Sequence, residues 1–199
     1  MSKISYLFIK VTLLTLIVSV CICSTSCDLL YSFLNSNELT QAEWNSALNE
    51  QRFHNVTING GENYIFKIVG GKIYLNDKII DDEDEDYYTA KMIISILNHC
   101  DKNNFSYDSK NNVYAAKSKV DFYFPMKVEV GGVFDTDATV DIIGEARNLM
   151  LIFDSEKNLQ KLICNLTLTF EVLGIKKTTE TSSFVVSFSD YGTTTVNKK

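Results

Sequence analysis

The stretch LTLTFEV at residues 166–172 decides the fold class of this chain. Every second residue is apolar and the residues between them are threonine or glutamate, which is the period of a β-strand with one buried face and one face in water. Residues 134–142 repeat the pattern, with aspartate at three of the wet positions. The pattern predicts a sheet that buries one side, as antiparallel sheets commonly do.

Strand-like alternation extends over most of the chain. Residues 54–80 predict a three-stranded meander in which Gly70 and Gly71 form a two-residue turn. Further stretches rich in β-branched and aromatic residues are 105–107, 113–116, 120–130, 133–143, 149–153, 159–173 and 182–189. We therefore expect nine or ten strands.

Two segments predict helices. Thr40 and Glu43 have the spacing of a capping box, and Leu39 and Trp44 stand at the two positions of a hydrophobic staple, so a helix starts at Thr40 and runs to about residue 49. This placement gives Trp44, the only tryptophan, a packing role. Residues 87–98 have an amphipathic pattern and follow six consecutive acids, 81–86, which favour a helix N-terminus.

These elements predict an α+β fold. We expect a strongly curved antiparallel sheet, a half-open barrel of nine or ten strands, with two short helices packed on it. The chain has no internal repeat, and residues 39–199 read as a single domain.

The composition narrows the functional classes. The 199 residues are 45% hydrophobic and contain nine glycines and one proline, which argues against a disordered or low-complexity chain. The formal net charge is −6, with 19 basic and 25 acidic residues, so the clustered cations that a nucleic-acid partner requires are missing. We expect no nucleic-acid binding.

The N-terminus predicts export. Residues 1–26 contain Lys3 and Lys10, no acid, and a 13-residue apolar run at 11–23 before a small-residue stretch, which is the order of a secretory signal peptide. The run is short for a membrane span, because a helix of that length covers about 20 Å of a ~30 Å hydrocarbon core. A permanent anchor helix that begins earlier remains the alternative.

The position at which this leader is cleaved determines whether the protein is attached to the membrane. Residues 24–27, STSC, resemble the lipobox of bacterial lipoproteins, which implies that Cys27 is acylated and that residues 27–38 are the lipidated cysteine and its tether. The protein would then sit on the extracytoplasmic side of the cell membrane. The family usually has leucine where Ser24 stands, and a freely secreted protein cut after Cys23 or Ser26 is the alternative.

Processing changes the charge and the thiols. Removal of Lys3 and Lys10 takes the net charge from −6 to −8, so the acyl chains rather than a basic patch would provide attachment to an anionic membrane. Cys100 and Cys164 are the two thiols left, either free and buried or joined in one disulfide.

The whole mature chain has a further resemblance. The lipobox-like start, the short helix around Trp44, the amphipathic strands, the strand and turn at 149–159 and the ending at 188–196 look like uncharacterised lipoproteins of Gram-positive gut bacteria. Their architecture is similar to the LolA/LppX-like lipoprotein carriers, in which the concave face of the sheet binds acyl chains. The resemblance implies a lipid-binding concave face and carries over no individual functional residue.

Catalytic patterns are weak. His54 and His99 are the only histidines and have no metal-binding spacing, and the acidic run 81–86 fails as an EF-hand because Tyr87 stands where glycine is needed. No nucleophile elbow or phosphate loop occurs. We expect no enzyme activity, no metal and no cofactor, with a hydrolase assembled from distant residues as a minor alternative.

The functional hypothesis is a non-enzymatic, membrane-tethered extracytoplasmic lipoprotein whose concave sheet face binds a lipid or another apolar ligand. Candidate lining residues are Val56, Ile58, Tyr64, Phe66, Tyr74, Phe122, Phe124, Leu168 and Phe170. The alternative is a structural or protein-interaction module with a filled core and no ligand cavity.

Overall fold

A computed structural model describes residues 38–60, 64–82, 84–130, 136–172 and 175–196. Residues Glu38–Lys199 form one compact unit. The leader, Cys27 and the tether up to residue 37 lie outside the described residues. The elements in chain order are α2 (Gln41–Ala47), η1 (Glu50–His54), β1 (Asn55–Asn59), β2 (Ile65–Val69), β3 (Lys72–Leu75), β4 (Lys78–Ile80), α3 (Glu85–Asn98), η2 (Lys102–Asn104), β5 (Phe105–Asp108), β6 (Val113–Ala116), β7 (Val120–Val130), β8 (Thr136–Phe153), β9 (Leu159–Val172) and β10 (Ile175–Ser189).

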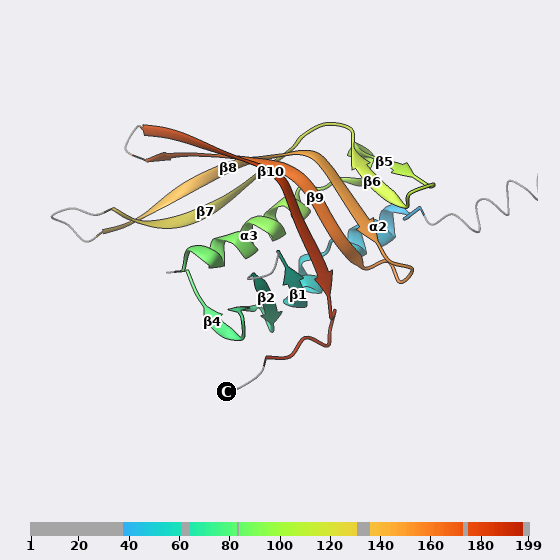
Figure 1. Ribbon diagram of the computed structural model, residues 1–199, viewed down its shortest axis with the longest axis horizontal. Helices are drawn as coiled ribbons and strands as arrows, with labels where there is room; N and C mark the ends of the chain where they lie inside the picture. The colour runs from blue at the N-terminus through green and yellow to red at the C-terminus, as the bar shows by residue number, and fades with distance from the viewer. Residues whose placement is uncertain (1–37, 61–63, 83, 131–135, 173–174, 197–199) are drawn as a thin grey trace, which may run out of the picture. The chain divides into compact units, whose positions relative to one another are not determined.

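The described strands form one antiparallel sheet in the order β4-β3-β2-β1-β10-β9-β8-β6-β5, and β7 pairs with the other half of β8 (Figure 1). The predicted α+β class, with ten antiparallel strands and two short helices, is confirmed. The sheet does not close, because β4 and β5 are its two ends and β7 has a partner only on the β8 side. Within the described residues no helix is long and apolar enough to span a membrane.

The first hairpins show where turn chemistry decides the strands. Gly70 and Gly71 have φ of 59° and 79°, so the predicted two-residue turn is confirmed. Residues 72–80, expected to be one strand, are β3 and β4 with a second such turn at Asn76 and Asp77, whose φ values are 49° and 67°. The meander therefore has four strands, because asparagine and aspartate tolerate the left-handed region that this turn requires.

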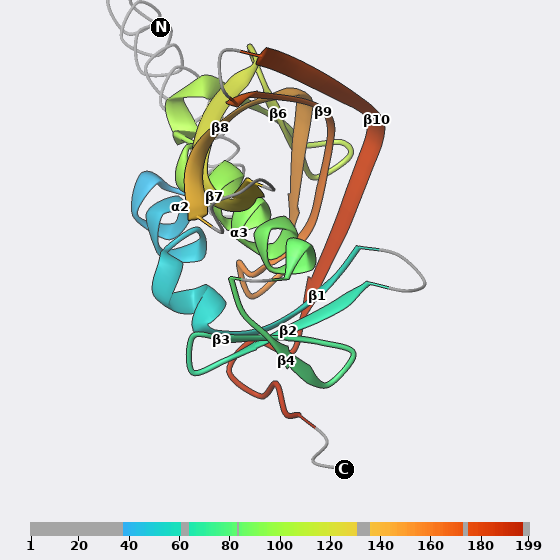
Figure 2. The same cartoon turned by 90° about the vertical axis from the view of Figure 1, so that its left-hand side faces the viewer.

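Register shifts interrupt the pairing on both sides of β9, and two of them face the same part of that strand. The stretches 133–143 and 149–153, expected as separate strands, belong to the single strand β8, which has a bulge between Arg147 and Met150. A second bulge between Thr181 and Phe184 interrupts β10 opposite the same part of β9. Bulges bend strands and increase their twist. Figure 2 shows β8, β9 and β10 turning around α3.

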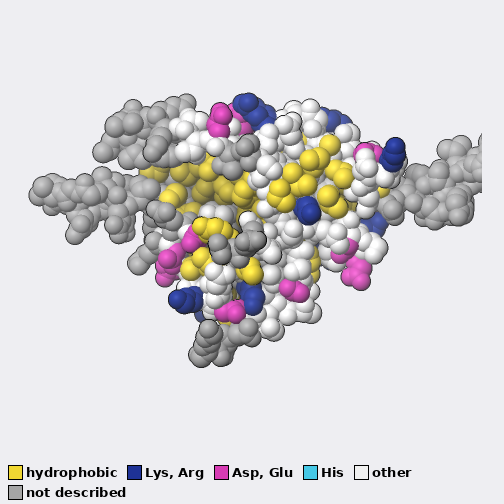
Figure 3. Space-filling view, viewed as in Figure 1, with side chains coloured by type: hydrophobic (Ala, Val, Ile, Leu, Met, Phe, Trp, Pro, Cys, Tyr) yellow, Lys and Arg dark blue, Asp and Glu magenta, His cyan; other side chains and the backbone are white. Residues whose placement is uncertain are grey.

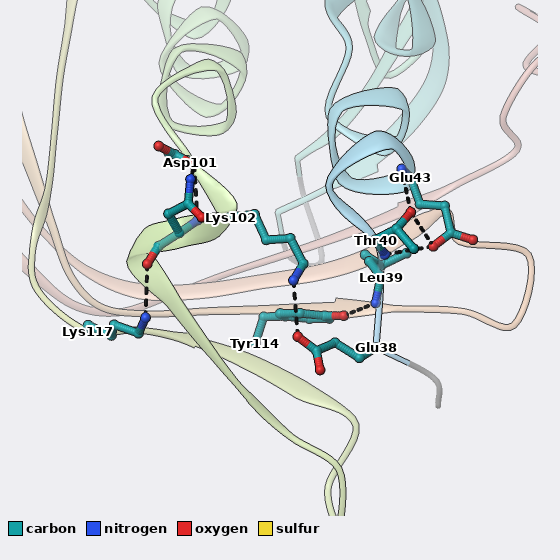
Figure 4. Close-up of polar contacts among 9 residues, drawn as sticks. Glu38, Leu39, Thr40, Glu43, Asp101, Lys102, Tyr114 and Lys117 are labelled. Carbon is teal, nitrogen blue, oxygen red and sulfur yellow. Dashed lines mark hydrogen bonds and ion pairs between the residues drawn. The ribbon is translucent and has the colours of Figure 1, made fainter. Parts of the chain in front are cut away.

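Helix α2 starts with the predicted capping box. Thr40 Oγ1 accepts from the backbone N–H of Glu43 at 3.2 Å, and Glu43 Oε2 accepts from the backbone N–H of Thr40 at 2.7 Å (Figure 4). The N–H of Leu39 donates to the hydroxyl of Tyr114 on β6, which joins the helix start to the sheet.

Trp44 has the predicted packing role. Its side chain is 1% exposed and lies 4.9 to 5.6 Å from the rings of Phe105, Tyr114 and Phe153. The indole Nε1–H donates to the carbonyl oxygen of Cys100 at 3.0 Å, which satisfies its buried donor and ties α2 to the end of α3.

Helix α3 begins two residues before the predicted position and ends at Asn98 as expected. Ala90, Ile93 and Leu97 are buried, as the amphipathic pattern predicts. The helix lies against β7 on one side and contacts η1 and β3 on the other (Figure 2). The face of α3 that is not buried is therefore bordered by two other elements.

Candidate functional site

The residues expected to line a concave cavity are mostly in the core. Val56, Ile58, Phe66 and Phe122 are 0 to 1% exposed and belong to one packed cluster of buried hydrophobic residues. Tyr64 is 49% exposed, Phe124 is 7% exposed, and Tyr74 and Leu168 are half-buried. The side chain of Phe170, like Cys27, lies outside the described residues.

A groove follows the unburied face of α3. We call it the α3 groove, and its volume is about 590 Å³, within the range of ligand-binding clefts. The η1 residue Glu50 borders it on one side and β7 on the other. Its lining residues are Glu50, Asp82, Tyr87, Tyr88, Lys91, Ile94, Ser95, Asn98, His99, Tyr123, Phe124 and Pro125. Of the residues expected to bind a ligand, only Phe124 is among them.

The wall formed by β7 is an edge strand whose free edge is partly blocked at Tyr123 and Pro125. Ser95 Oγ donates to the carbonyl oxygen of Tyr123 at 2.8 Å, so the backbone of Tyr123 points away from β8 and toward α3. Because hydrogen-bonded and non-hydrogen-bonded positions alternate along an antiparallel pair, the backbone of Pro125, two residues further on, points the same way. Pro125 has no N–H to offer. The groove is thus bounded by an edge that proline and the helix protect from strand addition.

Aromatic rings line much of the groove. The ring of His99 lies 5.2 Å from the ring of Tyr123 in an edge-to-face arrangement, and Tyr123 is 66% exposed. Tyr87 and Tyr88 are 5.4 Å apart, also edge to face. The ammonium of Lys91 lies 5.4 Å from the centre of the Tyr87 ring, a cation–π contact. The groove therefore offers aromatic faces and edges together with polar atoms.

The lining of the groove contains more acidic than basic side chains. Glu50 and Asp82 contribute carboxylates to its lining and Lys91 contributes the one ammonium. Asp84 is the N-cap residue of α3 and Asp86 lies in its first turn, close in the chain to the lining residues Asp82 and Tyr87. The acids favour the helix N-terminus, and they also make this end of the groove negative.

The groove brings a serine and a histidine together with carboxylates, the arrangement that would favour a hydrolase. Ser95 Oγ, however, donates to the carbonyl oxygen of Tyr123, and His99 Nδ1 lies 2.8 Å from the carbonyl oxygen of Ser95. A carbonyl oxygen only accepts, so Nδ1 carries the proton of the imidazole. A serine nucleophile needs its hydroxyl bonded to the histidine base. Here both side chains bind backbone oxygens instead, and Ser95 connects α3 to β7.

The two cysteine thiols, like Ser95 and His99, are not arranged for nucleophilic catalysis. Cys100 and Cys164 are free and buried, and burial raises the pKa of the Cys100 thiol and raises the pKa of Cys164 to about 12. Cys100 Sγ donates to the carbonyl oxygen of Ile96 at 3.2 Å. Thiols that stay protonated are poor nucleophiles. Among the described residues no group of three or more His, Cys, Asp or Glu side chains is arranged to hold a metal ion.

Sequence reasoning missed Tyr123 and Pro125, which form the groove wall on β7 together with the predicted residue Phe124. Alternation correctly puts Tyr123 on the face opposite Phe122 and Phe124, but it does not reveal which edge of the strand is unpaired. The one available signal was Pro125, because proline within a strand indicates an edge. The hydrogen bond from Ser95 on α3 to Tyr123 on β7 joins residues 28 positions apart, and no sequence pattern predicts a contact over that distance.

Comparisons with known proteins find no counterpart for this chain. No protein-family model matches it, and neither a curated protein nor a solved structure matches it.

Proposed function

We propose that this chain is a non-enzymatic lipoprotein, tethered through Cys27 on the extracytoplasmic side of the cell membrane, that acts as a protein-interaction module through the α3 groove. The leader and the lipobox-like residues 24–27 support export and tethering. The groove supports binding. Ordinary cleavage of the leader, which would leave a secreted protein with the same groove, is the alternative for its location.

One observation carries the choice of site. The groove is open and its lining includes Tyr123, a large aromatic side chain that is 66% exposed, whereas Val56, Ile58, Phe66 and Phe122 are buried against other core residues. Large aromatic residues at an accessible surface are the usual anchors of protein interfaces. A filled core beside such a groove is the arrangement expected of an interaction module.

A second candidate function is binding of an apolar ligand on the sheet itself. Hydrophobic side chains gather on one face of the molecule over β7 to β10 (Figure 3). Leu168 and Met126 are half-buried rather than fully buried on these strands. This candidate retains the original expectation of a lipid ligand, with the half-buried Leu168 as a predicted lining residue on these strands.

Extraction of lipids from protein purified without detergent distinguishes the two candidate functions. Lipid that co-purifies in near-stoichiometric amount, together with binding of the neutral dye Nile red that Leu168→Ala weakens, would favour the apolar ligand. Protein free of lipid that does not bind the dye would favour the interaction module.

Photo-cross-linking tests the interaction site directly. We expect benzoylphenylalanine at position 123 to give a discrete higher-mass adduct in cells that carry the protein, because Tyr123 is 66% exposed in the groove. The same probe at Tyr64, which is 49% exposed and outside the groove, is the matched control. Absence of an adduct at position 123, or equal adducts at both positions, would contradict the assignment.

Tethering has its own test. Cys27→Ala should release the protein into the medium or block its processing, because the acyl chains provide the attachment. Membrane retention and a mass identical to the unsubstituted protein would show that Cys27 is not lipidated.

A further inference from the structure

We infer that the α3 groove binds a basic, extended segment of a partner protein, with its cationic side chains at the acidic end of the groove. This inference rests on the proposed function and names the occupant of the same site. It follows from the length of the groove, from its charge and from the state of the β7 edge.

The dimensions fit a short extended peptide. Tyr87 and Asn98 line the groove and are eleven residues apart on α3, which corresponds to about 16 Å along the helix. An extended chain advances about 3.3 Å per residue, so about five residues would lie along this length. The groove is open along one side, which suits a linear segment better than an enclosed small molecule.

The charge favours a basic occupant. Asp82 lines the groove where α3 begins, Asp84 is the N-cap residue of α3 and makes no side-chain capping bond, and Asp86 lies in the first turn. Glu50 adds a carboxylate from η1. Lys91 is the only cation in the lining, and its ammonium already lies over the Tyr87 ring, which shows that this ring accepts a cation. Opposite charges across an interface increase both its specificity and its association rate.

The β7 edge determines the mode of recognition. An extended peptide often adds a strand to a free sheet edge. Here the carbonyl oxygen of Tyr123 already accepts from Ser95, and Pro125 has no N–H to donate. The segment would therefore be recognised through its side chains: cationic groups on the carboxylates, and apolar groups between Tyr123, Ile94 and Phe124.

Two capped hexapeptides test the inference, one alternating lysine with leucine and one alternating glutamate with leucine. We expect the lysine peptide to bind to the full-length domain in isothermal titration at low salt and the glutamate peptide to bind at least tenfold more weakly. The double variant Asp84→Asn, Asp86→Asn should weaken binding of the lysine peptide by about fivefold, and this loss should shrink in 0.5 M salt, because screening removes interactions between exposed charges.

Further variants, some expected to strengthen binding and some to weaken it, make the test specific. Lys91→Gln should tighten binding of the lysine peptide by about two- to fivefold, because it removes the competing cation and frees the Tyr87 ring. Tyr123→Ala should weaken binding, whereas Tyr64→Ala should not. The double variant Glu156→Gln, Asp190→Asn changes the net charge equally at two exposed positions outside the groove and should leave binding unchanged.

Several results would overturn the inference. They are equal binding of the two peptides, no loss for the aspartate variant with unchanged circular dichroism, or weaker binding for Lys91→Gln. If neither peptide binds but position 123 still cross-links to a partner, the basic occupant is refuted and the interaction module stands. If position 123 does not cross-link, the proposed function itself fails.

Discussion

Gly144 on β8 allows the close packing of two strands, and we predict that Gly144→Ala destabilises the domain. Gly144 is directly opposite Phe122 on β7, and a Cβ at position 144 would lie 2.1, 2.5 and 2.6 Å from three carbons of the Phe122 ring. That ring is 1% exposed and stacks on Phe124 at 6.4 Å, so it has little room to move. The perturbation is one methyl group placed inside a packed aromatic pair.

The size of the effect follows from two opposing contributions. Overpacking of a core costs about 1–3 kcal/mol, and a Cβ only 2.1 Å from a ring carbon puts the cost here in the upper half of that range, at about 2–3 kcal/mol. Replacement of glycine by alanine within a strand recovers about 0.5–1 kcal/mol, because glycine loses more conformational freedom on folding. The free energy of unfolding should therefore fall by about 1–2 kcal/mol. For a domain of this size the melting temperature should fall by about 2–8 °C.

Urea unfolding followed by the fluorescence of Trp44, the only tryptophan, measures the effect. Phe122→Leu removes the clashing ring at a cost of its own, and the double variant should be more stable than the sum of the two single losses implies, by at least 1 kcal/mol. Unchanged stability of Gly144→Ala, or strict additivity in the double-mutant cycle, would refute the packing argument.

Two further predictions concern the helix start and the buried thiols. Thr40→Ala removes the capping box and should cost about 1 kcal/mol of unfolding free energy, while Thr40→Ser should retain most of it; equal losses in thermal melts would contradict this. Burial raises the pKa of both thiols, to about 12 for Cys164 from an ordinary value of 9.0, so the unfolded thiols ionise first and stability should fall as the pH rises from about 9 toward 12. Urea midpoints at pH 7.5 and 10.5 under reducing conditions measure this, and Cys164→Ala should reduce the difference; an identical difference in that variant would exclude the thiol as a cause.

Much of the fold could be predicted because local chemistry determines it. Thr40 and Glu43 form the capping box with each other three residues apart, and Gly70 and Gly71 supply the positive φ of their turn, so no distant residue is needed in either case. Alternation identified the buried side of β7 and β9. It failed at Asn76 and Asp77, where the turn interrupts a run of β-forming residues.

The candidate site was less accessible to such reasoning. The sequence suggested a cavity on the concave face, and the structure puts Val56, Ile58 and Phe66 in the cluster of buried hydrophobic residues. The same apolar pattern is compatible with either arrangement, because a period of two shows which residues share a face and not what covers that face. The α3 groove depends on which elements lie beside the helix.

The sequence by itself determined the strand and helix segments, the antiparallel class of the sheet and the acidic run before α3, because caps, turns and alternation act over a few residues. Only the tertiary structure decided that β7 ends the pairing of its half of the sheet, that Ser95 binds Tyr123 across 28 positions, and that aromatic rings meet the acids in one groove. These features arise from long-range packing, in which the energy of a contact depends on the whole chain having folded around it.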